Sequence, residues 1–446
     1  MVREVSLPDI LDAREQRAGR QRYLLEKYVS PIISFSMNIP GPVKDTALIR
    51  RAFAWGAGEL EKSLKKAEIP VAERLEVRAF TGCEQQLALR ADPGMIKTLC
   101  VAIEESCPMG RLFDMDVIAP DGRKLDRGEE RRCLVCGQRG RGCASRRVHS
   151  VPELQAAARA LMEEHFAALD RDTVVRLADQ ALRREVDTTP KPGLVDGRNT
   201  GSHRDMTRDT FYQSADALRS YWGRCFDLGR ESAGRPPEES FLLLREAGLR
   251  ADAAMLSATN GRNTHKGVIF TLGTVCGAVG RLWRPETPCR DIPAICAEAG
   301  AMYAPTLARD QAAFTGATAG ERLYLKTGNA GVRGELAAGL PGVTDVALPA
   351  MEAALSAGCD ENTAAVASLL ALIGRGTDTN MIHRGGEDAA REASEDAAAL
   401  LRSGPVPDLA AVEALDDAFI RRNLSPGGCA DLLAVSLFLR AWQHGE

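Results

Sequence analysis

The sequence predicts a multidomain protein, with an α+β domain in its N-terminal part and an all-α domain in its C-terminal part. A length of 446 residues exceeds what a single domain usually contains. Short β-rich runs alternate with helical patterns up to about residue 118, whereas the pattern beyond about residue 151 is helical. Aromatic residues make up only 5% of the chain, and abundant Ala and Leu favour helix over sheet.

The individual elements can be placed along the chain. We expect helices near residues 1–30, 45–66, 93–105, 151–184, 207–229, 237–259, 264–281, 289–307, 344–374, 384–403, 408–422 and 428–442, and strands near 32–37, 75–80, 85–89 and 112–118. We place the domain boundary so that the domains are 1–169 and 170–446, although no Pro/Gly-rich linker marks it. Gly273, Gly277 and Gly280 lie in a very apolar helical stretch and should let it pack centrally.

Composition limits the classes of partner. The chain is 45% hydrophobic and 26% charged with a net charge of −4, so it carries no global basic footprint for nucleic acid. No apolar run is long enough to span a membrane, and the charged N-terminus lacks the apolar core of a signal peptide. We therefore expect a cytoplasmic protein whose 12 cysteines are reduced, with neither nucleic acid nor membrane as a partner.

The first chemical motif is a pair of carboxylates in the strand expected at 112–118. Side chains alternate faces along a strand, so Asp114 and Asp116 should share one face while Phe113, Met115 and Val117 face a core. Two carboxylates about 7 Å apart on one strand face suit Mg²⁺ held against a triphosphate. Arg111 just before them offers a guanidinium to phosphate oxygens. The alternative is an exposed edge strand with two solvated Asp, because D-x-D alone is a weak motif.

A turn-rich, basic segment follows at 119–150. Cys133, Cys136, Cys143 and His149 have the spacing C-x₂-C-x₆-C-x₅-H, which permits tetrahedral zinc ligation. The alternative is a loop whose arginines contact phosphates. Those arginines are Arg131, Arg132, Arg139, Arg141, Arg146 and Arg147.

Five loops of the helical part combine Gly with polar and titratable groups. In 185–206, Pro190 and Pro192 end a helical pattern. The residues that matter in these loops are Lys191, Arg198, Asn199, His203, Arg204, Asp205, Asn263, Thr264, His265, Lys266, Arg333, Glu335, Asp378, Asn380, His383, Arg384, Ser425, Gly427 and Gly428. Each loop alone has an ordinary structural interpretation. Their recurrence predicts one shared polar site, because purely structural helix connections are seldom so rich in chemistry.

These motifs resemble two known families. Residues 170–446 resemble triphosphoribosyl-dephospho-coenzyme A synthase, CitG, and residues before them resemble the citrate lyase holo-acyl-carrier-protein synthase, CitX. The CitG motifs are Glu185-Val-Asp, Lys191-Pro-Gly-Leu-Val, Gly201-Ser-His-Arg-Asp-Met206, Asn263-Thr-His-Lys-Gly267, Thr377-Asp-Thr-Asn380, His383-Arg-Gly-Gly386 and Asn423-Leu-Ser-Pro-Gly-Gly428. The CitX motifs are Asn38-Ile-Pro-Gly-Pro with Lys44, Gly110-Arg-Leu-Phe-Asp-Met-Asp-Val117, Arg132-Cys-Leu-Val-Cys136, and Cys143 with Arg146-Arg and His149-Ser150. Ser202 and Cys429 depart from the family pattern, where Ala and Ser are expected.

The resemblance implies two consecutive reactions. The C-terminal domain would join ATP to 3′-dephospho-coenzyme A, releasing adenine. A nucleotidyltransferase-like N-terminal domain would then move the phosphoribosyl-dephospho-coenzyme A unit to a serine of the citrate lyase acyl carrier protein, releasing diphosphate. The alternative for the helical part is a metal-dependent glycohydrolase acting on an ADP-ribose-like group, and a zinc-dependent binding module is a third class.

The same resemblance suggests roles for the motif residues. Asp114 and Asp116 would hold Mg²⁺ for the transfer step, and Arg111 would bind the triphosphate. His203 and Asp205 would lie at the ribose centre, Asp205 also as a metal ligand, with Asp378 as a metal ligand or base. Phosphates would be held by Lys191, Lys266 and Arg384. Further substrate contacts are expected from Asn263, His265, Ser425, Gly427 and Gly428.

Overall fold

The computed structural model describes the chain except for residues 1–2, 129–130, 139–142, 144–145, 318 and 446. It divides into two compact units, Met1–Leu169 with Arg284–Thr287, and Asp170–Trp283 with Pro288–Glu446. The division falls inside a continuous helix, α5 (Val151–Asp187), and no irregular linker marks it. None of the described helices is both long and apolar enough to cross a lipid bilayer.

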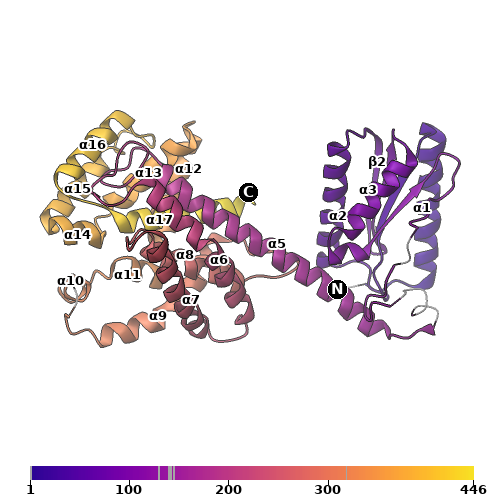
Figure 1. The fold of residues 1–446 in the computed structure, drawn as a ribbon, viewed down its shortest axis with the longest axis horizontal. Helices are drawn as coiled ribbons and strands as arrows, with labels where there is room; N and C mark the ends of the chain where they lie inside the picture. The colour runs from indigo at the N-terminus through magenta and orange to yellow at the C-terminus, as the bar shows by residue number, and fades with distance from the viewer. Residues whose placement is uncertain (1–2, 129–130, 139–142, 144–145, 318, 446) are drawn as a thin grey trace. The chain divides into compact units, whose positions relative to one another are not determined.

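The N-terminal unit is a four-stranded antiparallel sheet with helices on both faces (Figure 1). Its strands have the order β2-β3-β1-β4. The elements are α1 (Leu7–Tyr28), β1 (Ile32–Met37), α2 (Ala47–Lys66), β2 (Val71–Ala79), β3 (Gly82–Leu89), α3 (Pro93–Glu105), the 3₁₀ turn η1 (Pro108–Leu112) and β4 (Phe113–Ile118). The expected mixture of helix and strand in this part of the chain is confirmed.

The two faces of this sheet differ in polarity. Phe113, Met115 and Val117 are fully buried, as predicted, and Phe35 of β1 stacks on Phe53 of α2 with ring centroids 4.7 Å apart. The opposite face is polar and lies under α1. There Arg17 and Arg20 of α1 contact Glu84 at 2.6 and 2.5 Å. Because β4 pairs with β1 at the sheet edge, the alternation places Asp114 and Asp116 on this polar face.

The described residues of the C-terminal unit form helices and turns without strands, as expected. The helices are α5 from residue 170 onward, α6 (Arg208–Glu231), α7 (Pro237–Ala258), α8 (Lys266–Arg281), α9 (Ile292–Ala312), α10 (Ala319–Thr327), α11 (Gly331–Ala337), the π-helical η2 (Gly342–Ala347), α12 (Leu348–Ser356), α13 (Glu361–Gly374), α14 (Thr379–Gly385), α15 (Glu387–Ala399), α16 (Leu409–Arg421) and α17 (Gly427–His444).

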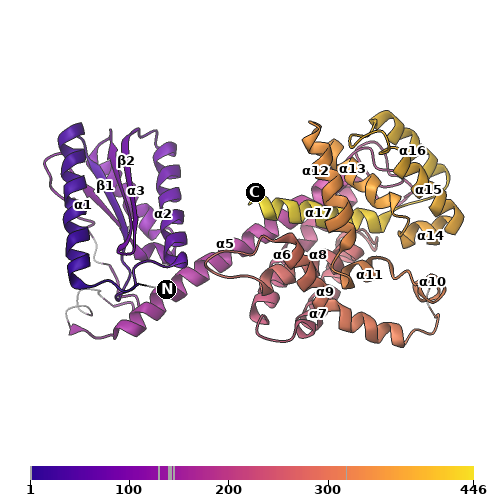
Figure 2. The same ribbon diagram turned by 180° about the vertical axis from the view of Figure 1, so that it is seen from behind.

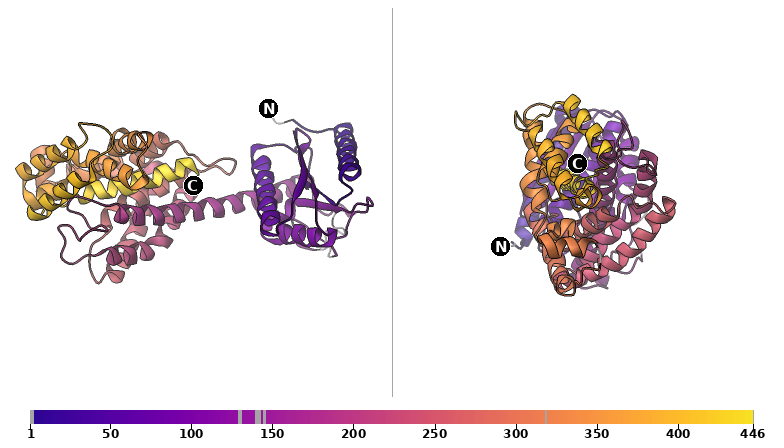
Figure 3. Two further views of the ribbon diagram at one scale, coloured as in Figure 1. Left: turned by 90° about the horizontal axis from the view of Figure 1, so that it is seen from above. Right: turned by 90° about the vertical axis from the view of Figure 1, so that its left-hand side faces the viewer.

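Two apolar helices, α8 and α17, form the centre of this unit. Figure 2 shows α17 running between the surrounding helices, and Figure 3 shows it nearly end-on within its unit. Helix α8 crosses α6 at very short range, since a Cβ on Gly229 would lie 2.0 Å from the Gly277 carbonyl oxygen. A Cβ on Gly280 would lie 2.1 Å from the Phe226 carbonyl oxygen. The central packing predicted for the glycine-rich helix is confirmed.

Several predicted helix limits are wrong. The stretch 344–374 is broken between α12 and α13, because Gly358 adopts a φ of +89° and Asp360 caps a new helix through the Thr363 N–H. The stretch 384–403 is likewise interrupted at Gly386, with a φ of +84°. Helices α10 and α11 were not predicted, because glycines at both ends hide their short helical patterns.

Candidate functional site

The N-terminal unit contains a large cavity beside the polar face of the sheet. It measures about 1250 Å³. Its polar and charged lining consists of Asn38, Lys97, Arg111, Asp114, Asp116, Lys124, Asp126, Arg127, Arg131, Cys133, Cys143, Arg147, His149 and Ser150. Basic groups outnumber carboxylates in this lining, so the cavity suits a ligand with several negative charges.

Asp114 and Asp116 both reach this cavity from β4. Asp114 lies opposite Ser36 and Asp116 opposite Ser34, which confirms that the two carboxylates share a face. The Lys124 ammonium lies 2.6 Å from the Asp116 carboxylate, and the Arg131 guanidinium lies 3.7 Å from Asp114. Both carboxylates remain partly exposed, with side-chain exposures of 42% for Asp114 and 26% for Asp116. They are therefore accessible to a ligand or a cation.

A buried glutamate holds the arginines beside this pair. Glu104 of α3 accepts the Met115 backbone N–H at 2.8 Å, and its carboxylate also pairs with Arg127 and with Arg131, the latter at 2.5 Å. This network connects β4 to the segment that follows it. The two guanidiniums are consequently positioned at the cavity before any ligand arrives.

Arg111 has spare hydrogen-bonding capacity at the same cavity. Its Nε donates to the Arg132 carbonyl at 2.6 Å, while its buried Nη1 makes no hydrogen bond with any described residue. Burial, together with nearby Arg131 and Arg127, lowers the pKa of Arg111. An anion would both satisfy the free donor and compensate the crowded positive charge.

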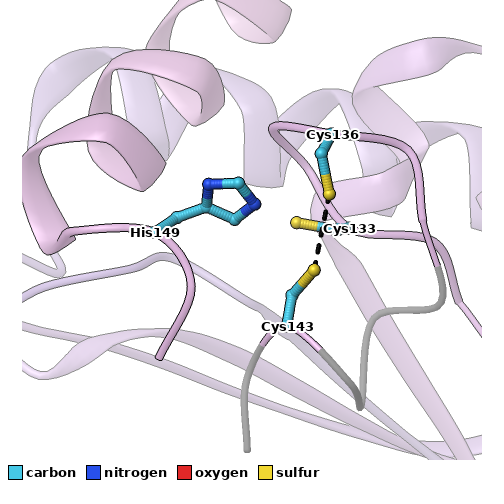
Figure 4. A group of neighbouring side chains, drawn as sticks. All are labelled: Cys133, Cys136, Cys143 and His149. Atoms are coloured by element: carbon cyan, nitrogen blue, oxygen red, sulfur yellow. Dashed lines mark hydrogen bonds between the residues drawn. The ribbon is translucent and has the colours of Figure 1, made fainter. Parts of the chain in front are cut away.

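The four predicted zinc ligands lie together at the edge of this cavity. The ligand atoms of Cys133, Cys136, Cys143 and His149 are all within 4.8 Å of one another (Figure 4). The alternative to zinc was a loop whose arginines contact phosphates. Of those arginines, Arg131 and Arg147 line the cavity. Arg139 and Arg141 lie outside the described residues.

A second cavity, in the C-terminal unit, measures about 490 Å³. It brings together residues from four of the five predicted loops and one side chain of the fifth. Its polar and glycine lining is Glu185, Lys191, His203, Asn263, Thr264, His265, Lys266, Gly267, Thr379, Asn380, His383, Arg384, Ser425, Gly427, Gly428 and Asp431. The fifth loop, 328–335, contributes Val332 rather than Arg333 or Glu335.

Two carboxylates, Asp416 and Asp196, fix the conformation of the loop between α5 and α6. Asp416, fully buried on α16, accepts hydrogen bonds from the Gly193 N–H at 2.9 Å and from Arg198 and Asn199 at 2.7 Å. Asp196 accepts the Lys191 N–H at 2.9 Å. Arg198 and Asn199 therefore shape the loop and do not line the cavity.

Lys191 and Glu185 form a buried ion pair at the base of the cavity. The Lys191 Nζ lies 2.5 Å from Glu185 Oε1 and donates to the Glu185 carbonyl at 2.7 Å. Lys191 is 1% exposed and Glu185 5%. Burial raises the pKa of Glu185, and Lys191 opposes that rise.

Asp431 of α17 adds a second carboxylate beside this pair. A Cβ on Gly267 would lie 1.8 Å from its Oδ2, so the carboxylate presses against the first turn of α8. No described residue makes a hydrogen bond or an ion pair with this carboxylate. Although solvent reaches part of Asp431 through the cavity, burial raises its pKa well above the usual range, assisted by Glu185 and Asp378. Such a carboxylate is suited to a cation.

Three histidines line the cavity, and two of them, His203 and His265, have different environments. The Nε2 of His203 lies 2.9 Å from the Ser425 Oγ, and burial with the nearby Arg384 lowers the pKa of His203. The Nδ1 of His265 lies 2.7 Å from the Ser214 Oγ, while its buried Nε2 has no hydrogen-bond partner among the described residues. Burial and nearby Lys191 lower the pKa of His265 to about 3, so this imidazole is neutral at physiological pH.

The first turns of two long helices line the same cavity. Helix α8 contributes Lys266 and Gly267, and helix α17 contributes Gly427 and Gly428. The N–H groups of a first helical turn lack partners within the helix and carry partial positive charge. With Arg384 also in the lining, this side of the cavity is arranged for anions.

Two predicted site residues lie elsewhere. Asp205 is exposed and does not line the cavity. Asp378 is buried behind it, where its carboxylate accepts the Asn380 N–H at 2.8 Å and the Met381 and Cys429 N–H groups at 3.0 Å. Asp378 thus caps α14 and joins it to α17, a role for which Asp is preferred.

The departures from the family pattern have local explanations. The Ser202 Oγ donates to the Leu424 carbonyl at 2.6 Å, joining the α5–α6 loop to the start of α17. Cys429 is a buried residue of the first turn of α17, and its N–H donates to Asp378. Neither residue lines the cavity, so neither replacement changes its lining.

Sequence reasoning did not assign roles to Glu185 and Asp431, although both lie within the motifs. Asp431 follows Gly427 by four residues, which puts both on one face of α17. This four-residue spacing was the feature of the sequence that could have identified Asp431 as a site residue. Glu185 lies at the end of α5, and only the path of the following loop brings Lys191 back to it.

Comparison with known proteins identifies both parts of the chain. Residues 171–446 match the family model of CitG, ATP:dephospho-CoA triphosphoribosyl transferase, and residues 5–165 match that of CitX, apo-citrate lyase phosphoribosyl-dephospho-CoA transferase. The chain is also 33% identical over 457 residues to "Protein CitXG" of Haemophilus influenzae, covering 99% of this chain and 97% of the relative. The chain belongs to the CitXG family.

Other relatives agree with this membership. "Protein CitXG" of Leuconostoc mesenteroides subsp. cremoris is 31% identical over 98% of this chain and 97% of its own length. The 2-(5''-triphosphoribosyl)-3'-dephosphocoenzyme-A synthase of Pectobacterium atrosepticum is 42% identical over 62% of this chain and 90% of its own length. As a CitXG protein, the chain is a bifunctional transferase of citrate lyase prosthetic-group synthesis.

Proposed function

We propose that the C-terminal unit converts ATP and 3′-dephospho-coenzyme A to 2′-(5″-triphosphoribosyl)-3′-dephospho-coenzyme A and adenine. The observation that carries this proposal is the meeting of two helix N-termini, Arg384, Lys266, three histidines and two carboxylates around one cavity. The reaction needs a site that holds a triphosphate while the bond between ribose and adenine breaks. The family description of residues 171–446 names the same pair of reactants.

The triphosphate of ATP is assigned to the first turns of α8 and α17. Gly427 and Gly428 expose backbone N–H groups there, and Lys266 and Arg384 add positive charge. Lys191 has two of its three ammonium protons directed at Glu185, which leaves one for a phosphate oxygen. This arrangement holds the triphosphate, which stays on the transferred ribose, while the bond between ribose and adenine breaks.

The chemical step is a displacement at the anomeric carbon of the ATP ribose. The 2′-hydroxyl of dephospho-coenzyme A forms a bond to that carbon, the bond to adenine breaks, and the hydroxyl proton must be removed. We assign proton removal to His203, whose lowered pKa keeps the imidazole neutral at physiological pH.

The donor set at this cavity fits Mg²⁺. Asp431 would hold it with Glu185, because both carboxylates line the cavity and a divalent cation would compensate a carboxylate whose pKa is raised first by burial and then by Glu185 and Asp378. When bound, Mg²⁺ neutralises phosphate oxygens of ATP. This assignment replaces Asp205 and Asp378 as metal ligands, since Asp205 is exposed and absent from the cavity lining and the carboxylate of Asp378 accepts three backbone N–H groups.

For the N-terminal unit we propose transfer of the phosphoribosyl-dephospho-coenzyme A unit to a serine of the citrate lyase acyl carrier protein. The serine hydroxyl attacks the α-phosphorus, diphosphate leaves, and the hydroxyl proton is lost. Asp114 and Asp116 would hold Mg²⁺, which supplies charge neutralisation at the transferred phosphoryl group. Arg111 and Arg131 would bind the diphosphate. The chemistry is that of nucleotidyltransferases, and we place both steps in the cytoplasm.

Incubation of the chain with ATP, Mg²⁺ and dephospho-coenzyme A tests the first reaction. Adenine and a triphosphoribosyl adduct should appear in equal amounts, as measured by chromatography and mass spectrometry. His203→Asn should abolish both, while His444→Asn, at the exposed end of α17, should change neither. Free ribose triphosphate without adduct would instead indicate a glycohydrolase.

A further inference from the structure

The cluster of Cys133, Cys136, Cys143 and His149 has the composition and spacing of a closed metal site. All four ligand atoms lie within 4.8 Å of one another. In a tetrahedral site with zinc–sulfur bonds of about 2.3 Å, neighbouring ligand atoms lie about 3.8 Å apart. We propose that these four residues bind one structural Zn²⁺, a function separate from both transferase reactions.

The backbone around the first two cysteines has the turn that such a site requires. The Gly137 N–H donates to the Cys133 carbonyl at 3.2 Å, and the Cys133 N–H donates to the Gln138 carbonyl at 2.7 Å. Gly137 adopts a φ of +69°, which only glycine tolerates readily. This turn directs both thiols to one side. The Sγ atoms of Cys136 and Cys143 lie 3.4 Å apart.

His149 completes the set from a different element. Figure 4 shows the Nε2 side of its ring facing the three sulfur atoms. Nε2 is buried and makes no hydrogen bond with any described residue, although a buried imidazole nitrogen normally has a partner. The next residue, Ser150, caps α5 through hydrogen bonds with Glu153, so the start of that helix fixes the position of His149. A metal ion would satisfy the unpaired nitrogen.

Ligand chemistry favours zinc over the Mg²⁺ proposed for the two cavities. Three thiols and one imidazole are soft or borderline ligands, whereas Mg²⁺ requires oxygen. Four protein ligands leave no open coordination position, which is typical of a structural site and not of a catalytic one. All 12 cysteines are free in the structure, so the thiols are available as ligands.

The position of the cluster suggests what the ion does. Cys133 and Cys143 line the N-terminal cavity, as do Arg131 and Arg147, each within four residues of a proposed ligand. The described residues between β4 and α5 contribute no strand to the four-stranded sheet. Binding free energy at a structural zinc site is folding free energy. The ion would therefore fix the path of this segment and hold its arginines at the cavity.

Metal content of the purified full-length chain tests the proposal. We expect about one zinc ion per chain by elemental analysis, and a Co²⁺-substituted protein with the intense absorption of tetrahedral thiolate ligation. Cys136→Ser should lower zinc content at least about tenfold. Cys107→Ser, a partly buried thiol in the same unit but outside the cluster, should retain zinc like the unmodified chain.

Two further measurements keep the proposal testable if Cys136→Ser does not fold. His149→Cys preserves four ligands and should retain zinc, whereas His149→Ala should lose it. Chelation of the unmodified chain should expose three additional thiols to a thiol reagent while the helical circular dichroism changes little. Zinc below a tenth of an ion per chain after reconstitution, or equal zinc in the unmodified chain and Cys136→Ser, would overturn the proposal.

Discussion

The N-terminal cavity presents Asp114 and Asp116 to solvent and to basic partners, whereas the C-terminal cavity encloses Glu185 with Lys191 beside Asp431. Exposed ion pairs contribute little to stability, because water and salt screen them. A buried pair leaves an uncompensated charge when one partner is removed. Substitution of Asp114 or Asp116 should therefore change chemistry alone, whereas substitution of Lys191 should change chemistry and stability together.

The largest effect expected from this contrast concerns Lys191. Lys191→Met leaves Glu185 buried without its partner and should destabilise the C-terminal unit by about 3–5 kcal/mol. Lys326→Met is the matched control, because Lys326 lies at the same 2.5 Å from Glu387 but both side chains are exposed. It should cost less than about 1 kcal/mol. Urea unfolding of both variants measures the difference, and equal losses would contradict the contrast.

The next effect concerns transfer to the carrier protein. Asp114→Asn should slow carrier modification at least about 100-fold, because charge stabilisation by a metal is worth several kcal/mol. Adenine release and the urea midpoint should remain unchanged. Asp121→Asn, an exposed carboxylate after β4 outside the cavity lining, should keep both activities. A folded Asp114→Asn chain that has also lost adenine release would show that the two sites are not independent.

Acid should destabilise the C-terminal unit through His265. Its folded pKa of about 3 lies below the unfolded value of 6.5, so the unfolded chain binds the extra proton between these values. The stability contributed by neutral His265 is present above pH 6.5 and decreases as pH falls toward 3, by about 1.4 kcal/mol per pH unit. Unfolding between pH 7 and 5 should show a shallower slope for His265→Asn than for the unmodified chain. Identical slopes would refute this source of acid sensitivity.

The smallest effect concerns a residue that supports the C-terminal cavity from outside. Ser202→Ala removes one hydrogen bond to the Leu424 carbonyl and should cost about 1 kcal/mol of stability. Because Ser202 does not line the cavity, the Michaelis constants for ATP and dephospho-coenzyme A should stay the same. Steady-state kinetics would show a changed Michaelis constant if Ser202 contacted substrate.

Much of this organisation could be predicted from local sequence. The alternation in β4 placed Asp114 and Asp116 on one face, and the apolar glycine-rich stretch identified α8 as central. Both predictions depend on period and side-chain type, which are local properties. The meeting of the helical loops at one site was also predicted. Each loop combines Gly with polar and titratable side chains, which purely structural helix connections seldom do.

The remaining details depend on tertiary structure. Asp378 has the residue type of a base, but its position before α14 makes it a cap. Glu185 and Asp431 are 246 residues apart and meet only through the packing of α5, α8 and α17. Asp205 lies in the motif that supplies His203, yet the loop turns it to solvent. No spacing rule distinguishes these cases without the path of the chain.

The central claim is that two separate cavities in one chain carry out successive reactions. Apo carrier protein incubated with ATP, Mg²⁺ and dephospho-coenzyme A can be examined by mass spectrometry. The unmodified chain should add the phosphoribosyl-dephospho-coenzyme A mass, while Asp114→Asn alone and His203→Asn alone should not. A mixture of these two variants should restore the modification, because the first makes the intermediate and the second transfers it. Failure of the mixture, or modification by Asp114→Asn alone, would contradict the account.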